Sequence, residues 1–581
     1  MDIPLKNLEV LVLDCQATGP NPWKGRLLEI GWARTCASHP ADAGRQEPEV
    51  HLVDLPEGER LPRRVSSITG ITEVDLEGAS PPSLIWNRLK KAANETAVAS
   101  GTGVCTAVVH FSRFEEPFIT DLRDRYEPDG ELPMKVVCTH KIAKRLLPDL
   151  PRRGIRAVAG YFGHSVPEAK RAGHHTLATA FIWQNLVRKL EEEHGITGLS
   201  ELHDWLDRKE VPTSPGRSYP LDSSVYQNLP DDPGVYRMLR SNGDPLYVGK
   251  AKSLKVRVGS YFQKKRRHSE HILEMLSQVY DLDVTITGSA LEAALLESDE
   301  VKRLSPPYNI ALRERERRTV FCTRDFAHCE ALPDETHPVG PLPSPESLTP
   351  LRTLLDLLTE SGSTAESIAI ERAMGMPEDY LPDKDSFREG MDEFRQRHEE
   401  SIGISPGPRE LIALGRQLWL ERLHALDQEA LLGEDEDEEL EGELVEWVWT
   451  PEAVANTLES VVRRSTHMIR RGRWFTILSE SSLAWEPVKG SGRKRTLVVI
   501  ENGAIRSRRS FQANSRVPVP PGHARPFRER QKCFDLPTYD RMRVLTTEIR
   551  RLIAEGRGVE LRPNKRSVLR NKELAKTIRW I

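Results

Sequence analysis

Two short runs of β-branched and aromatic residues, each bounded by glycine, predict a β-hairpin near the middle of the chain. The runs lie at 234–236 and 247–249, with the sequences Gly-Val-Tyr and Tyr-Val-Gly. Apolar runs bounded by glycine in this way are typical of strands. Asn242-Gly243 lies between them, and Asn-Gly favours a tight hairpin turn. The pattern therefore predicts two antiparallel strands joined by residues 241–244.

Two helices are predicted after the hairpin. Over about 251–262 the apolar residues recur at helical spacing, and Arg257 and Tyr261 are four residues apart on one side. Ser289 to Glu292 forms a capping box that begins a second helix, which continues to about residue 304. Glu297 interrupts its apolar face. A carboxylate partly removed from water in this way needs a positive partner.

The amino-terminal part begins with two predicted strands. Residues 9–15 and 26–33 read as strands, and further motifs lie at 68–72, 108–115 and 173–180. The stretch from Leu190 to Tyr219 contains a charged helix and then a Pro- and Gly-rich loop, which marks a linker.

The whole chain reads as an α/β multidomain protein. We expect helices over 351–358, 408–430 and 539–555, a helix that begins with Thr450-Pro451 and ends near 468, and strands at 474–478 and 496–503. The predicted parts are a first α/β domain (1–195), a linker (196–220), a small α/β module (221–317), a mostly helical region with an acidic loop (318–449) and a basic α+β region (450–581).

Composition excludes few classes of protein but points to a cytoplasmic chain. The 581 residues are 38% hydrophobic and 29% charged, which fits a folded globular protein without a membrane span. The first residues lack the pattern of a secretory signal. Seven cysteines are scattered without a Cys-x-x-Cys pair, so reduced thiols are expected.

Charge is concentrated in blocks, although the net charge is only -4. An acidic run at 434–439 separates two basic regions, and we interpret it as a solvated loop. The second basic region covers about 493–530. The first follows the hairpin, and its predicted DNA-binding residues are Lys252, Lys255, Lys264, Lys265, Arg266 and Arg267.

The hairpin and the residues at fixed distances after it resemble the GIY-YIG nuclease module, most closely that of the UvrC excision-repair endonuclease. The resemblance covers about 229–313. It implies a metal-dependent endonuclease that nicks one DNA strand in nucleotide excision repair. It also implies one Mg²⁺ or Mn²⁺ on Glu297, and a catalytic set of Tyr236, Tyr247, Lys250, Arg257, Tyr261 and Asn309.

The resemblance gives these side chains roles. Tyr247 would act as general base, Arg257 would stabilise charge on the phosphate, and Asn309 would tie its loop to the hairpin. Two alternatives remain open. Glu297 could form an ion pair with Lys250, Arg257 or Lys302 instead of binding a metal, and Tyr236 could be only a core residue.

The first domain resembles DnaQ-type 3′–5′ exonucleases of the DEDD class, on the RNase H-like fold. Its site residues in this chain are Asp14, Gln16, Glu115, His174 and Thr179. The family has carboxylates at four of these positions and a histidine as base. An amide and a hydroxyl are neutral ligands that compete poorly with water for Mg²⁺. The departures predict a weak or inactive exonuclease, with a one-metal site on Asp14 and Glu115, or DNA-end binding, as alternatives.

The order of domains resembles Cho-type homologues of UvrC with an exonuclease-like domain in front. The sequence has no helix-hairpin-helix pair and no second acid-rich nuclease half. The resemblance implies DNA as substrate, and damage recognition by partners such as UvrA and UvrB. Two other functions stay open: a structure-selective nuclease on branched DNA, and a DNA-binding scaffold with both sites silent.

Overall fold

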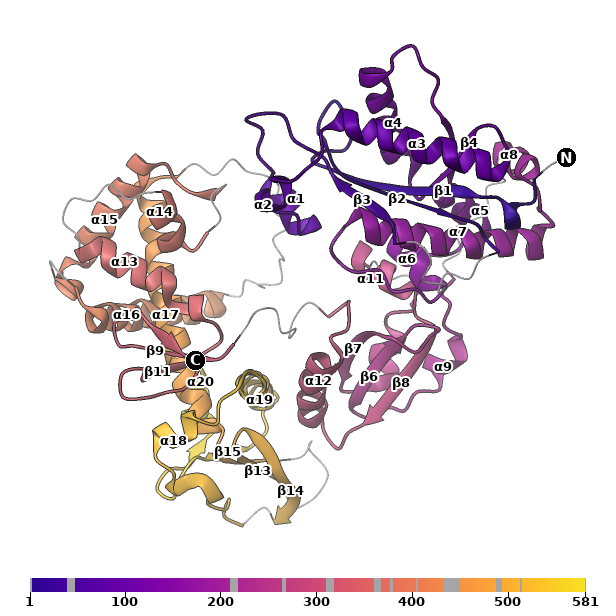
Figure 1. The fold of residues 1–581 in the computed structure, drawn as a ribbon. Coiled ribbons are helices and arrows are strands. Elements are labelled where there is room, and N and C mark those ends of the chain that lie inside the picture. The colour runs from indigo at the N-terminus through magenta and orange to yellow at the C-terminus, as the bar shows by residue number, and fades with distance from the viewer. Residues whose placement is uncertain are drawn as a thin grey trace. The chain divides into compact units, whose positions relative to one another are not determined.

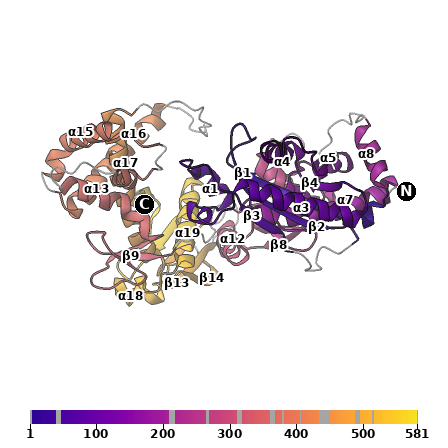
Figure 2. The same cartoon turned by 45° about the horizontal axis from the view of Figure 1, so that its top comes forward.

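The computed structural model of the chain describes residues 3–38, 47–208, 218–263, 268–309, 318–359, 367–376, 380–403, 406–432, 449–486, 494–512 and 515–579. The chain divides into two compact units. The first comprises Met1–Ala293 and Leu304–Ala311, and the second comprises Ala294–Arg303 and Leu312–Ile581. Within these units, packed helices and sheets can be followed in two views (Figures 1 and 2).

The first domain is built on a five-stranded sheet with the order β3-β2-β1-β4-β5. The strands β1 (Val10–Ala17), β2 (Leu27–Thr35) and β3 (Glu49–Leu52) are antiparallel neighbours, whereas β4 (Cys105–Val109) and β5 (Met134–Cys138) continue parallel to β1. The predicted strands at 9–15 and 26–33 are thus confirmed. Because β1 is central, its side chains are buried on both faces of the sheet.

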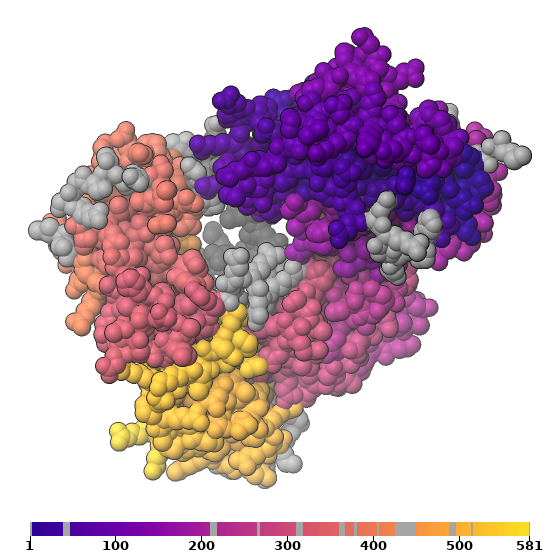
Figure 3. Space-filling view, in the orientation of Figure 1, coloured from indigo at the N-terminus to yellow at the C-terminus, as the bar shows by residue number. Residues whose placement is uncertain are grey.

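Helices cover both faces of this sheet. Leu11 and Leu13 of β1 share a core with α3 (Pro82–Ser100) and α4 (Ser112–Tyr126). Val10 and Val12 point the other way, into the core formed by α5 (Thr139–Leu146), α6 (Ile155–Tyr161) and α7 (Ala172–His194). The shorter α1 (Arg63–Thr69) and α2 (Glu73–Leu76) lie after β3 along the chain. The domain forms one continuous packed surface, drawn in indigo and purple (Figure 3).

The predicted linker at 196–220 is wrong in its first half. Residues Leu199–Asp207 form α8, and Leu202 of this helix is fully buried in the core beside α7. The sequence of this short segment favours a helix only weakly, and the packing of its apolar face in the core stabilises the helix. Residues 209–217, which include most of the Pro- and Gly-rich loop, lie outside the described residues.

The hairpin module contains the predicted pair of strands. A three-stranded antiparallel sheet has the order β7-β6-β8, formed by β6 (Gly234–Leu239), β7 (Pro245–Ala251) and β8 (Asp281–Ile286). The Asn-Gly turn joins β6 to β7, and Gly243 has a φ of 86°, which favours glycine. The helices of the module are α9 (Ser223–Gln227), α10 (Leu254–Gly259), α11 (Glu270–Leu276) and α12 (Ala290–Leu304).

The helix predicted over 251–262 is shorter than expected. Ala251 still belongs to β7, and the side chain of Ser253 caps α10 by accepting a hydrogen bond from the N–H of Val256 at 3.1 Å. Lys250 therefore lies in a strand rather than at a helix start. The start of α12 is as predicted, because Ser289 Oγ accepts from the N–H of Glu292. The boundary between the two units crosses this helix.

The first domain and the hairpin module contact each other through α6 and α11. Arg156 pairs with Glu274 at 3.1 Å, and its guanidinium lies 5.2 Å from the ring centre of Tyr308. The N–H of Arg152 donates to Ser277 Oγ at 3.0 Å. A paired charge and a ring contact at one place hold these two parts of the first unit together.

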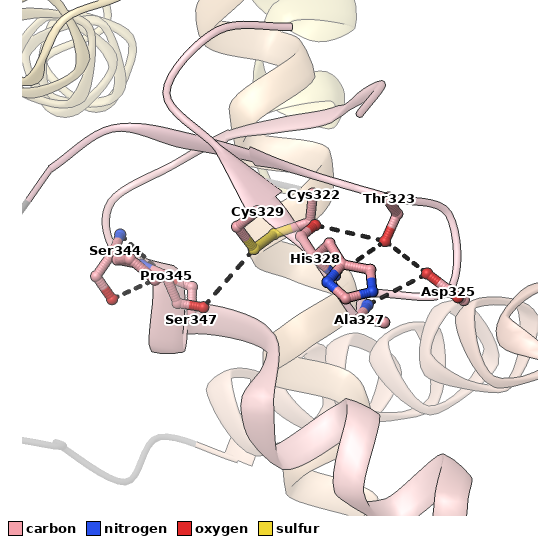
Figure 4. The surroundings of a disulfide bond; sticks show 9 residues. All are labelled: Cys322, Thr323, Asp325, Ala327, His328, Cys329, Ser344, Pro345 and Ser347. Atoms are coloured by element: carbon pink, nitrogen blue, oxygen red, sulfur yellow. Dashed lines mark hydrogen bonds between the residues drawn. A yellow bond between two sulfur atoms is a disulfide. The ribbon is translucent and has the colours of Figure 1, made fainter. Parts of the chain in front are cut away.

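The second unit begins with a small sheet, β10-β9-β11, formed by β9 (Val320–Cys322), β10 (Cys329–Glu330) and β11 (Val339–Leu342). Cys322 and Cys329 are facing residues of β9 and β10 and form a disulfide (Figure 4). The prediction that all thiols are reduced is thus wrong for this pair, because cross-strand pairing brings the two sulfurs together. The other five cysteines form no disulfide.

A group of helices packs beside this sheet. They are α13 (Thr349–Thr359), α14 (Ser367–Met374), α15 (Lys384–Ile402), α16 (Pro408–Leu432) and α17 (Pro451–Leu478). The helices predicted at 351–358 and 408–430 are confirmed, and Thr450 caps α17 as expected. The acidic run at 434–439 lies outside the described residues.

The C-terminal region has a second five-stranded sheet, with the order β14-β13-β12-β15-β16. Its strands are β12 (Ser482–Trp485), β13 (Lys494–Glu501), β14 (Ala504–Gln512), β15 (Val559–Arg562) and β16 (Leu569–Arg570), and its helices are α18 (Phe527–Gln531), α19 (Leu536–Ala554) and α20 (Asn571–Arg579). The strand predicted at 474–478 is wrong, since these residues form the last turns of α17. In the described part of the chain, no helix has the length and apolar character needed to cross a bilayer.

Candidate active site

The hairpin places three tyrosines in one cluster. Tyr236 lies on the central strand β6, directly opposite Gly249 of β7, and Tyr247 lies two residues before that glycine. Tyr261 follows α10. The ring centres of Tyr236 and Tyr247 are 6.1 Å apart, those of Tyr236 and Tyr261 are 6.2 Å apart, and those of Tyr247 and Tyr261 are 6.5 Å apart. Three residues that are distant in sequence thus converge on one point.

Hydrogen bonds and one cation connect the phenols. The hydroxyl groups of Tyr236 and Tyr261 are 3.1 Å apart, and Arg257 donates to the Tyr261 hydroxyl at 3.3 Å. The Arg257 guanidinium also lies 5.2 Å from the Tyr261 ring centre. The predicted closeness of Arg257 and Tyr261 is therefore confirmed, although Tyr261 lies just after the end of α10. A positive charge held over phenol oxygens can stabilise negative charge that develops beside them.

Burial controls the protonation of this cluster. Tyr236 is fully buried, and burial together with the neighbouring phenols Tyr247 and Tyr261 holds its pKa well above the usual value. Burial alone would lower the pKa of Arg257, but the phenols around it raise this pKa overall. Tyr236 is therefore a neutral hydrogen-bonding group, whereas Arg257 keeps its charge.

Glycine at position 249 is required by the closeness of the phenols. A Cβ atom at this position would lie 2.4 Å from the Tyr236 hydroxyl and 2.7 Å from Cε1 of Tyr247. Both distances are too short for van der Waals contact. Any side chain at Gly249 would push the two rings apart, so this glycine determines the spacing of the cluster.

Asn309 fastens the loop after α12 to the hairpin. Its amide nitrogen donates to the carbonyl of Val248 at 2.8 Å, and its carbonyl oxygen accepts from the N–H of Val248 at 2.9 Å. The predicted connection between this loop and the hairpin is confirmed. The contact fixes the backbone on either side of Val248, where Tyr247 and Gly249 lie.

Asn309→Ala is expected to lower the free energy of unfolding by about 3 kcal/mol. The change removes both partners of a buried backbone unit, and each buried group left unpaired costs about 1–3 kcal/mol. Denaturant unfolding followed by tyrosine and tryptophan fluorescence measures the loss. Asn242→Ala is the matched control, because the side chain of Asn242 is exposed and its hydrogen bonds to the carbonyl of Gly163 and to Asp244 lie at the surface. Equal stability of the two variants would contradict the prediction.

Glu297 lies on α12 between the fully buried residues Ala294 and Val301 and is itself half-buried. In the described part of the chain, no group of three or more His, Cys, Asp or Glu side chains could hold a metal ion. A single carboxylate fits Mg²⁺, because this ion keeps several waters and commonly binds only one or two protein carboxylates beside substrate phosphates. The donor chemistry of Glu297 is therefore compatible with one such ion.

The basic residues near the hairpin are only partly described. Lys252 is exposed on the segment before α10, Lys255 is exposed on α10 itself, and Lys250 is half-buried in β7. The remaining predicted DNA-binding residues, Lys264, Lys265, Arg266 and Arg267, lie outside the described residues.

The first domain has a second polar cluster at the end of β1. Asp14 is buried, Gln16 Nε2 donates to its Oδ2 at 2.8 Å, and His175 Nδ1 lies 3.4 Å from its Oδ1. Burial raises the pKa of Asp14 despite these contacts. Burial, and then the charge of Asp14, raise the pKa of Glu115 to about 9. A carboxyl group with this pKa is protonated at neutral pH.

This cluster does not fit two divalent cations. Gln16 presents an N–H donor to Asp14 rather than another carboxylate, and Thr179 is fully buried. Among the described residues, Thr179 Oγ1 and Glu115 Oε2 have no hydrogen-bond partner. Two carboxylates and two neutral groups supply too little negative charge for a pair of ions.

Sequence reasoning missed His175. The motif places His174 at the base position, but His174 is exposed on α7, while His175 is buried and faces Asp14 and Gln16. Helical spacing could have indicated this, because His175 is four residues before Thr179 and seven before Ile182, both fully buried.

Comparison with known proteins identifies one segment clearly. Residues 232–310 match the family described as the UvrC-like GIY-YIG domain. Over 90 residues the chain is 51% identical to UvrABC system protein C of Psychrobacter sp. (strain PRwf-1), and over 88 residues it is 47% identical to the same protein of Clostridium botulinum. These matches cover 16% and 15% of the chain and 14% of each relative, so the chain spans only a small part of these relatives.

Solved structures are similar to two parts of the chain. The GIY-YIG N-terminal endonuclease domain of UvrC from Thermotoga maritima, bound to magnesium, is 28% identical, with a TM-score of 0.14; the match covers 16% of this chain and 100% of that one. Exonuclease X in complex with 5′ overhanging duplex DNA is 17% identical, with a TM-score of 0.25; the match covers 34% and 99%.

Proposed function

We propose that the chain is a metal-dependent DNA endonuclease that nicks one strand in nucleotide excision repair through its hairpin module. The observation that supports this most is the cluster of Tyr236, Tyr261 and Arg257, joined by hydrogen bonds and fastened by Asn309. The cluster lies in the segment that is 51% identical to a curated UvrC protein. The first domain would take the RNase H-like fold of DnaQ-type exonucleases.

Each side chain of the cluster has its own role in phosphodiester hydrolysis. Tyr247 is half-buried beside two other phenols, and it acts as general base on the attacking water. Arg257 stabilises the charge that builds on the phosphate. Tyr236 stays protonated and, with Tyr261, orients the water and a phosphate oxygen by hydrogen bonds. Lys250 attracts the phosphate electrostatically.

Glu297 would hold a single Mg²⁺ or Mn²⁺. When bound, the ion supplies Lewis-acid polarisation of the phosphate and stabilises the leaving oxygen. The role of Glu297 is to provide one carboxylate from a rigid helix. Its half-buried position strengthens the attraction to a cation relative to a fully solvated carboxylate.

The first domain contributes little or no exonuclease activity in this proposal. Its Asp14 and Glu115 are the remaining acids, and the raised pKa of Glu115 keeps this group protonated. The contacts of Arg156 with Glu274 and Tyr308 support a structural role, in which the domain supports the hairpin module.

Damage recognition would come from partners of the UvrA–UvrB type in the cytoplasm. With these two proteins and Mg²⁺, the chain is expected to nick a duplex that carries one bulky adduct at least about tenfold faster than the same duplex without the adduct, since specificity is a difference between substrates. The measurement is a gel assay with each strand labelled in turn.

The control reactions omit UvrA and UvrB and offer a branched duplex of the same sequence. Faster nicking of the branched duplex without the two proteins would replace the repair function by structure-selective cleavage. If no substrate is nicked faster in the presence of metal, the function of the chain would be that of a DNA-binding scaffold.

A further inference from the structure

Basic side chains from three helices of the second unit gather along α17. The long helix α17 runs from the helical group to the C-terminal sheet and contacts both α16 and α19 (Figure 1). We name this set the arginine ridge; it consists of Arg416 and Arg422 of α16, Arg463, Arg464, His467, Arg470, Arg471 and Arg473 of α17, and Arg550 of α19.

The members of the ridge repel one another. Burial and then the charges of Arg422 and Arg464 lower the pKa of Arg463. Burial and then Arg416 and Arg473 lower the pKa of Arg470. Glu459 is the acid that acts on Arg463, and it is shared with Arg397 and His398 at 3.3 and 3.0 Å. Like charges held close together destabilise a fold.

Burial and neighbouring positive charges also lower the pKa values of His467 and Arg550. Burial, followed by the charges of Arg471, Arg550 and Arg470, lowers the pKa of His467 to about 4. Burial and Arg471 lower the pKa of Arg550. His467 is therefore neutral at physiological pH, and the positive charge of the ridge is carried by its arginines.

Neutral groups hold several ridge side chains in place. Arg471 donates to the Tyr539 hydroxyl at 3.1 Å, and Arg550 donates to the carbonyl of Ile578 at 3.0 Å. His467 stacks on Trp419, with ring centres 4.6 Å apart. Such partners fix the positions of the side chains without cancelling their charge. The ridge therefore presents ordered cations to a ligand.

We propose that the arginine ridge binds the phosphate backbone of the DNA on which the chain acts. Arg463 and Arg470 are seven residues apart and therefore lie on one face of α17, about 10 Å apart along the helix, a length over which duplex DNA presents about six phosphates. The exposed Arg464 and Arg473 lie on the two sides of this face. A polyanion relieves the repulsion within the ridge, and guanidinium groups match phosphate geometry. The inference rests on the proposed function only in taking DNA as the ligand.

The test compares two triple variants of the full chain. Arg416→Gln/Arg464→Gln/Arg473→Gln removes three exposed ridge charges. Arg388→Gln/Arg506→Gln/Arg528→Gln removes three charges that are paired with acids, namely Asp385 at 2.7 Å, Glu501 at 2.9 Å and Glu335 at 3.5 Å. The two variants have the same net charge. They differ in whether each lost charge has an ion-pair partner among the residues that the structure describes. Circular dichroism checks that both are folded.

Binding is measured by fluorescence anisotropy with a labelled duplex in EDTA, so that cleavage does not contribute. At about 0.1 M salt the ridge variant is expected to bind at least about tenfold more weakly than the parent chain, and the slope of log K against log salt is expected to fall by about 2–3. The control variant is expected to stay within about twofold of the parent. Because no chemistry occurs, the result is independent of whether the chain nicks DNA in the presence of Mg²⁺.

Two results would overturn the proposal. Equal weakening of both variants would mean that only net charge matters. Unchanged DNA binding by the ridge variant, together with lost binding to anionic phospholipid vesicles, would identify a membrane surface as the partner instead.

Discussion

Glu297→Gln is expected to reduce metal-stimulated nicking by at least about a hundredfold. An amide keeps the size of the side chain but removes the negative charge that a divalent ion requires. Loss of a Lewis acid removes several kcal/mol of stabilisation from the transition state, and each 1.36 kcal/mol is about tenfold in rate. The measurement is the initial rate of nicking on one labelled duplex over a series of Mg²⁺ concentrations. The rate of the variant should stay low at all of them.

Glu292→Gln is the matched control for this experiment, because it makes the same chemical change on the same helix. Glu292 accepts a hydrogen bond from the N–H of Gly288 at 2.9 Å, and an amide oxygen can still accept it. This variant should keep nearly the full rate. A thermal shift on addition of Mg²⁺ should be present in the parent and in Glu292→Gln and absent in Glu297→Gln. Parent-like nicking by Glu297→Gln would remove the assigned role of this residue.

The hairpin module could be predicted from its sequence because its determinants are local. The Asn-Gly turn fixes the register of β6 and β7, and this register places Tyr236 opposite Gly249. Arg257 and Tyr261 are only four residues apart in sequence, and they meet at the C-terminal end of α10. The role of Asn309 came from the family resemblance, since no local pattern shows that a loop sixty residues later bonds to β7.

The errors occur where tertiary packing overrides local preference. Residues 474–478 are aromatic and β-branched, which favours a strand, but they continue α17 because Trp474, Phe475 and Leu478 are buried on its packed face. The disulfide between Cys322 and Cys329 depends on the pairing of two very short strands, which the sequence pattern does not reveal. The arginine ridge also arises from contacts between three helices that are distant in sequence.

The site of the first domain was predicted from motif positions, and its chemistry depends on burial. The sequence shows that acids are missing at positions 16 and 179, but not that Glu115 is almost completely buried. Burial decides whether a carboxyl group is ionised. The functional question for this domain is therefore whether Glu115 is a protonated core residue or a metal ligand, and the two possibilities have opposite consequences for stability.

Glu115→Gln is expected to stabilise the first domain by up to about 5 kcal/mol at pH 8, because each pH unit between 4.5 and 8 contributes about 1.36 kcal/mol. The pKa of Glu115 is about 9 in the folded chain, against an ordinary value of 4.5. Between these values the unfolded chain releases a proton that the folded chain retains, so the stability contributed by Glu115 falls as the pH rises from 4.5 to 9. Glutamine is neutral throughout, and the advantage of the variant should therefore grow over this window. Calorimetry of the full chain between pH 5 and 8.5 measures the shift in melting temperature.

Glu29→Gln is the control that should move the melting temperature in the opposite direction. Glu29 is also fully buried, but it accepts hydrogen bonds from Arg171 at 2.6 and 2.9 Å and from the N–H of Ala172 at 2.6 Å. Its replacement leaves a guanidinium without its counter-charge and should destabilise the domain. If Glu115 instead binds a metal, Mg²⁺ should stabilise the parent chain and not Glu115→Gln. That outcome would show that the first domain has kept a metal site in spite of its missing acids.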